Sequence, residues 1–179
     1  SGTRPLTREV LLEALDQQAV MIYEIARQLN TILDLPTALQ EVSNILQRAM
    51  GADHCGIILT ENFDKLQELG YPETIAREAI KKRSTIVLSD IRNLTEHQVG
   101  RSAMLAKIRS ILCVPVLSGE ELLGLIYLFK TDPAAPPFDP RDLQLAVSIS
   151  HQAALTIQRT RLMQELQDYR LIQSMIGRF

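Results

Sequence analysis

The chain has no tryptophan, and aromatic residues make up only 4% of its 179 residues, with a formal net charge of -2. Domains that bind nucleic acids normally carry a basic face and aromatic side chains that stack on bases, so we expect no nucleic-acid partner. No apolar run reaches the ~20 residues of a membrane-spanning helix, and the N-terminal residues lack a signal-peptide pattern. The sequence therefore predicts a cytoplasmic chain without a membrane partner.

Cysteine and histidine are also scarce. The two cysteines, Cys55 and Cys113, each lie inside an apolar, strand-like run, which is neither a disulfide framework nor a zinc-site spacing. We expect both to be reduced, buried thiols with raised pKa values. The histidines His54, His97 and His151 are too scattered to chelate a metal, so no metal site is predicted. His97, on a polar connection, is either a haem-like ligand or a solvated loop residue.

Two amphipathic helices open the chain. Apolar residues at spacings of three, four and seven predict a long first helix from Thr7 to Leu33. A second helix is predicted from Leu35 to Met50, because Pro36 suits a first helical turn and Gly51 suits a C-terminal cap. The short polar lead and the helical pattern at the C-terminus further predict that the chain is a piece of a longer protein.

Strands and helices alternate in the middle of the chain. We predict strands at 55–60, at 63–69 (a weak edge strand) and at 85–89, with helices at 72–83 and 102–109. A hairpin with arms 111–117 and 122–129 is apolar on both faces, which is typical of central strands. Its turn contains Gly119, and Pro115 predicts a local defect in strand pairing. Asp139 and Pro140 begin a helix that runs to the end of the chain.

The hairpin at residues 113–128 (CVPVLSGEELLGLIYL), with Pro115, Gly119 and Gly124, resembles the central strand pair of the GAF domain family. The stretch 138–162 is similar to the family's closing helix. The resemblance implies an α+β fold, a GAF-like α/β/α sandwich with a mixed, mostly antiparallel sheet of about five to six strands and long N- and C-terminal helices. The expected divisions are a dimerisation helix at 1–19, the GAF-like domain at 20–162 and a helical linker at 163–179.

Family ligand patterns are not reproduced in this sequence. The family's cyclic-nucleotide-binding residues occur at Asn62–Lys65 only in a different order, so that pattern is absent. Neither cysteine has the sequence context of a bilin attachment site. Two isolated cysteines do not reproduce the cluster of the branch that reduces free methionine sulfoxide, and no phosphate loop or nucleophile-base motif is present. We therefore expect no catalysis. The cofactor, if the chain has one, stays unidentified.

Two functions remain open at this stage. One is a sensory module of a bacterial-type signalling protein that binds a small molecule; the other is a purely structural dimerisation module with a self-filled pocket. A ligand would lie over the sheet face covered by residues 90–110, because loops carry binding groups. The candidate contacts there are Ser102, Met104, Arg109 and Cys113.

The terminal helices carry heptad repeats. Apolar residues recur every seven positions on the first helix, and Leu155, Leu162 and Tyr169 do so on the last, which indicates helical seams. An alternative is that both stripes pack on their own sheet, as expected at 25–32 and 147–157, but the stretches 11–22 and 162–176 extend beyond a sheet of ordinary length and would face water in a monomer. We therefore predict a homodimer that transmits state to a covalently linked output domain. The predicted interface residues are Leu11, Leu15, Ile22, Leu29, Leu155, Leu162 and Tyr169.

Overall fold

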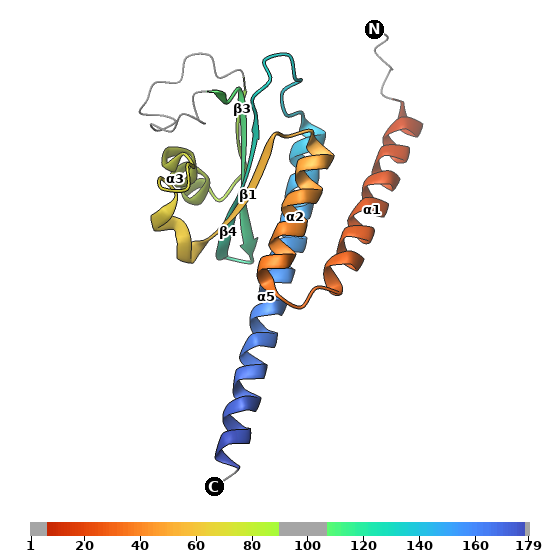
Figure 1. Cartoon of the computed structure of the whole chain (residues 1–179). Helices are drawn as coiled ribbons and strands as arrows, with labels where there is room; N and C mark the ends of the chain where they lie inside the picture. Colours follow the sequence, from red (N-terminus) through yellow and green to blue (C-terminus); the bar gives the residue numbers. More distant parts are fainter. Residues whose placement is uncertain (1–6, 90–106, 178–179) are drawn as a thin grey trace.

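The computed structural model describes residues 7–89 and 107–177. Long helices lie on one side of a sheet and a smaller helix covers the other (Figure 1). In chain order the elements are α1 (Arg8–Asn30), α2 (Leu35–Met50), β1 (His54–Leu59), the 3-10 helix η1 (Thr60–Lys65), α3 (Glu73–Lys82), β2 (Ile86–Leu88), β3 (Ser110–Ser118), β4 (Glu121–Lys130) and α5 (Pro140–Ile176).

Local signals determine where the helices begin and end. Asp34 caps α2 by accepting a hydrogen bond from the Thr37 backbone N–H at 3.0 Å, and Gly51 ends it with φ at 59°. Asp139 and Asp142 form a capping box at the start of α5, where their side chains accept from each other's backbone N–H groups. The predicted bounds of the second helix are thus confirmed.

The described sheet has four strands in the order β1-β4-β3-β2, and every pairing is antiparallel. Among the described residues the sheet therefore has fewer strands than the expected five to six, and it is antiparallel rather than mixed. The predicted edge strand at 63–69 is wrong, because η1 and a series of turns occupy that stretch. Phe63 and Leu66 lie three residues apart and both pack on the core, a spacing that suits one face of a helical turn and not of a strand.

The hairpin of β3 and β4 forms the centre of the sheet, as predicted. Pro115 lies opposite Leu125, next to a register shift between Val116 and Leu117, and the pairing with β2 ends at Cys113. Gly124 is required by a close approach, because a Cβ there would lie 2.6 Å from the backbone oxygen of Ile58. The predicted pairing defect is therefore present beside the proline.

Both faces of the sheet are buried in separate core clusters. Leu112, Val114 and Val116 pack toward α1, α2 and α5, while Ile111 and Cys113 face the side that carries α3. The alternation along β3 places neighbouring side chains on opposite faces. The α/β/α layering is thus confirmed, and it accounts for the apolar character of both faces of the hairpin.

The last helix extends well beyond the sheet. At about 1.5 Å per residue, α5 is about 55 Å long, and its C-terminal half projects from the layered body in Figure 1. Both α1 and α5 run unbroken through the expected divisions at 19/20 and 162/163. Of the predicted helix at 102–109, residues 102–106 lie outside the described part, and residues 107–109 are not α-helical.

Candidate functional site

Aromatic side chains fill the described sheet face on the α3 side. Tyr71, Tyr127 and Phe129 are all buried, and the ring centroids of Tyr71 and Tyr127 lie 4.7 Å apart. The Tyr127 hydroxyl donates to the Pro72 carbonyl oxygen at 3.2 Å. These contacts leave the tyrosines anchored in the core.

His54 extends this aromatic group at the end of β1. Its Nε2 lies 2.8 Å from the Tyr71 hydroxyl, and its ring stacks on Phe129 with centroids 5.5 Å apart. Burial lowers the pKa of His54 and raises the pKa of Tyr71 to about 12, so both side chains are neutral near pH 7. Gly56 makes room for this arrangement, because a Cβ there would lie 1.8 Å from the Tyr71 hydroxyl.

A cleft of about 470 Å³ opens at the end of the sheet where β2 ends and β3 begins. Arg109 lines it, and the Nε atom of this side chain is buried without a hydrogen-bond partner among residues 7–89 and 107–177. Its backbone N–H donates to the Lys130 carbonyl oxygen at 2.7 Å, which ties Arg109 to β4. The lining residues are Ser89, Arg109, Ser110, Asp132, Pro133, Ala135 and Pro137.

Of the ligand residues expected from the sequence, the structure describes Arg109 and Cys113. Arg109 lines the cleft, but Cys113 is 0% exposed and packs in the core cluster of the α3 side, so its assignment as a ligand contact is corrected. Ser102 and Met104 lie outside the described residues. No local pattern marks Ser89 and Asp132 as cleft residues, because the fold brings them together from separate segments.

The cysteines lie on opposite faces of the sheet. Cys55 belongs to the cluster beneath α1, α2 and α5, and Cys113 to the cluster on the α3 side. Burial raises the pKa of each thiol to about 12, as the sequence predicted. Neither thiol therefore has the lowered pKa that favours a thiolate nucleophile.

Within 7–89 and 107–177, no three His, Cys, Asp or Glu side chains gather as metal ligands would. His151 is exposed on α5, and His97 lies outside the described part. None of the helices in these ranges combines the length and apolarity needed to cross a bilayer.

The predicted interface residues differ in their exposure. Leu155, Leu162 and Tyr169 are 60%, 57% and 59% exposed, whereas Leu29 is 1% exposed and belongs to the core. The assignment of Leu29 to an interface is therefore corrected. Ile22 is half-buried, and the side chains of Leu11 and Leu15 lie outside the described part. Further exposed apolar residues of α1 and α5 are Val20, Met21, Tyr23, Leu166, Leu171, Ile172, Met175 and Ile176.

Three side chains on one turn of α5 join this helix to the rest of the domain. Gln158 donates to the Ser118 hydroxyl in the hairpin at 2.8 Å. Arg159 donates to the Leu29 and Ile32 carbonyl oxygens at 2.6 and 3.1 Å, and to the Asn30 side chain at 2.6 Å. We call Gln158, Arg159 and Arg161 the anchor turn.

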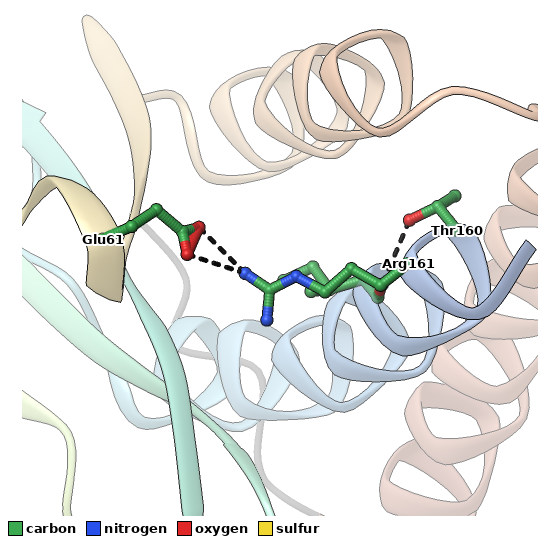
Figure 2. Close-up of polar contacts among 4 residues, drawn as sticks. Glu61, Thr160 and Arg161 are labelled. Carbon is green, nitrogen blue, oxygen red and sulfur yellow. Dashed lines mark hydrogen bonds and ion pairs between the residues drawn. The ribbon is translucent and has the colours of Figure 1, made fainter. Parts of the chain in front are cut away.

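Arg161 completes the anchor turn by reaching η1 (Figure 2). Its Nη2 donates to both carboxylate oxygens of Glu61, at 2.8 and 3.1 Å. The neighbouring Thr160 points the other way and donates its hydroxyl to the Thr156 carbonyl oxygen within α5. The anchor turn thus contacts the hairpin, the end of α1 and η1 at the point where α5 leaves the domain.

The central hairpin, the second helix and the first part of α5 fall within a single match to a known family. Residues 34–157 match the GAF domain. This chain belongs to the GAF domain family. GAF domains are typically regulatory modules that sense small molecules, although some GAF proteins are enzymes. A comparison with curated proteins found no match.

Solved GAF structures share the fold of this chain. The GAF domain of a phosphoenolpyruvate-protein phosphotransferase from Coxiella burnetii has a TM-score of 0.67 at 17% identity, covering 85% of this chain and 98% of that one. The GAF domain of the Acinetobacter phosphotransferase gives 0.64 at 16%, covering 82% and 95%. Free methionine-R-sulfoxide reductase from Neisseria meningitidis, solved with its substrate, gives 0.61 at 15%, covering 91% and 98%. At these identities the likeness shows the fold alone.

Proposed function

We propose that this GAF domain is a non-catalytic regulatory module that dimerises through α1 and α5 and passes its state to an output domain of a longer signalling protein. The observation that carries this proposal is the dual character of α5. Its first part supplies buried residues such as Ala146, Ile149 and Ile157 to the core, whereas every described residue from Gln164 onward is exposed. One rigid helix therefore belongs both to the domain and to a surface that needs a partner.

The exposed part of α5 is apolar along one side. At 100° per residue, six exposed residues fall within less than half of the helix circumference, while Leu171 and Met175 lie on the other side. We call these six residues the exposed stripe: Leu155, Leu162, Leu166, Tyr169, Ile172 and Ile176. A stripe of this kind is typical of a helix that packs against another helix.

The anchor turn supports transmission between the domain and α5. Each of its side chains reaches a different element, so displacement of the hairpin, the end of α1 or η1 acts on the same turn of α5. A shift or rotation of packed helices is a common way for such a displacement to reach a distant domain. Here the rigid α5 would carry it.

The absence of catalysis is supported by the state of the thiols. The Neisseria reductase shares the fold and is an enzyme, but in this chain Cys55 and Cys113 lie on opposite faces of the sheet with raised pKa values. They can neither form a disulfide with each other nor attack a substrate as thiolates without rearrangement. We therefore assign the chain a regulatory rather than a reductase role.

Ligand sensing is a second candidate function, and the cleft beside Arg109 favours it. The Nε of Arg109 is buried and has no hydrogen-bond partner in the part of the chain that the structure describes, and such a donor suits an anionic group. The cleft volume of about 470 Å³ admits a small carboxylate or phosphate. The competing view, a self-filled pocket without a ligand, is supported by the aromatic packing of Tyr71, Tyr127 and Phe129.

A thermal-shift screen separates these two views. Small carboxylates and phosphates at millimolar concentration should raise the unfolding temperature of the unmodified chain and not that of Arg109→Met. If no compound stabilises the unmodified chain, the sensing candidate is rejected and the self-filled module remains.

The dimer proposal is tested by sedimentation of surface variants. Ile22→Glu combined with Leu162→Glu should convert the dimer to a monomer at tens of micromolar, because carboxylates would be buried in the helical interface. Gln164→Glu, on the same exposed part of α5 but outside the stripe, is the matched control and should stay dimeric. Equal sedimentation of the double variant and the control would remove the terminal helices from the proposed mechanism.

A further inference from the structure

The order of residues along the exposed part of α5 contains information about how two copies would pair. Leu162, Tyr169 and Ile176 recur every seven residues, and Leu166 and Gln173 each follow four residues after a member of that series. This is the spacing of heptad positions d and a. We call Leu162, Leu166, Tyr169, Gln173 and Ile176 the seam.

An alternative assignment fits the sequence less well. If Leu162, Tyr169 and Ile176 occupied position a, position d would be Glu165 and Ile172. The Glu165 carboxylate would then be buried between the helices without a partner, which is costly. The first assignment instead places Leu166 at this level of the helix.

The charges beside the seam distinguish the two orientations of a helix pair. With Leu166 at position a, Glu165 is a g residue and Arg170 the e residue five positions further on. Both are exposed and neither takes part in an ion pair within the described chain. In a parallel pair, g of one helix meets e of the other, so Glu165 meets Arg170. In an antiparallel pair, g meets g and e meets e, so like charges would face each other.

Gln173 adds a second argument for a defined register. It is the single polar member of the seam, and its Nε2 donates to the Tyr169 hydroxyl at 2.8 Å within the same helix. A lone polar residue at position a specifies register and favours two strands, because any other register would bury it against apolar side chains. In a parallel pair in register, the two copies of Gln173 meet each other.

We propose that the α5 segments of two copies of this chain pair as a parallel, in-register, two-stranded coiled coil along the seam, with Glu165 of each copy against Arg170 of the other. The inference rests on the proposed dimeric function and adds orientation and register to it. Both domains of the dimer then lie at the same end of the coiled coil, and two output domains would leave it side by side at the other end.

Disulfide cross-linking tests the register directly. Leu166→Cys and Gln173→Cys, introduced separately into the whole chain and oxidised, should each give most of the protein as a covalent dimer on a non-reducing gel. In a parallel pair every a position meets its own copy, whereas an antiparallel pair can bring at most one of these two positions together. Gln164→Cys, which faces away from the seam, and the unmodified chain with its buried thiols are the controls and should stay uncross-linked.

Charge exchange provides a second, independent readout. Glu165→Lys should weaken the dimer about threefold or more, and Glu165→Lys with Arg170→Glu should restore the dissociation constant to within about twofold. Cross-linking at only one seam position, or no rescue by the double exchange, overturns the parallel register even if the chain is dimeric. A monomer in sedimentation would instead overturn the proposed function, so the two failures are distinguishable.

Discussion

The guanidinium group of Arg159, on α5, donates a hydrogen bond of 2.6 Å to the carbonyl oxygen of Leu29 in the last turn of α1. Carbonyl groups at a helix C-terminus lack partners within the helix and carry partial negative charge, so a cation there is favourable. The Arg159 side chain thus holds α1 against α5 where both contribute to the core.

Arg159→Ala should lower the free energy of unfolding by about 1–2 kcal/mol, because it removes the hydrogen bonds that the guanidinium group donates to carbonyl oxygens. Water replaces these bonds only in part. Hydrogen exchange should also accelerate in the last turn of α1. The measurements are urea unfolding and backbone amide hydrogen exchange. The control is Arg141→Ala, at an exposed position at the start of α5, and its free energy of unfolding should stay within about 0.5 kcal/mol of the parent value. Unchanged exchange in α1 would show that Arg159 does not hold it.

Gly124→Ala should destabilise the domain by about 1–3 kcal/mol, as overpacking of a core does. The added Cβ would lie 2.6 Å from the Ile58 backbone oxygen, and a backbone atom in a paired strand cannot turn aside. The matched control is Gly177→Ala at the end of α5, where the nearest atom to a Cβ lies at 3.3 Å. Equal urea midpoints for the two variants would refute the tight approach of β1 and β4.

Native thiol labelling should be slow near pH 8, since the pKa of both thiols is raised to about 12. The raised thiol pKa values make the free energy of unfolding depend on pH. Unfolded chains release the thiol protons near pH 9 and folded chains only near pH 12, so this stabilisation is full below pH 9 and is lost as the pH rises between the two values. The loss should approach about 1 kcal/mol per thiol for each pH unit. Urea unfolding at pH 8 and 10 should show a smaller loss for Cys55→Ala with Cys113→Ala than for the parent; an equal loss would contradict this account.

Local sequence signals predicted much of the fold. The bounds of α2 follow from Pro36 and Gly51, and the hairpin from its two apolar arms around Gly119, because these features act within a few residues. The stretch 63–69 was predicted wrongly, since a short segment with apolar residues and charges fits either an edge strand or a helical turn. Tertiary packing of Phe63 and Leu66 decided between them.

The candidate sites were less predictable because they depend on contacts distant in sequence. The heptad spacing that placed Leu29 at an interface is also the spacing of a helix packed on its own sheet, so it could not separate Leu29 from Leu162. The partners of Arg159 and Arg161 lie about 100 residues or more away, and no local pattern marks such pairs. The cleft beside Arg109 is likewise lined by residues from segments that are distant in the sequence.

The most direct test of the dimeric regulatory account is sedimentation velocity of the unmodified chain over a dilution series from about 50 to 1 micromolar. A stable two-copy interface in the micromolar range is expected if the exposed stripe of α5 and the exposed residues of α1 are covered by a second chain. The account predicts a species of twice the 20.1 kDa chain mass at the upper concentrations, with dissociation on dilution. A single monomeric species at 50 micromolar would contradict it.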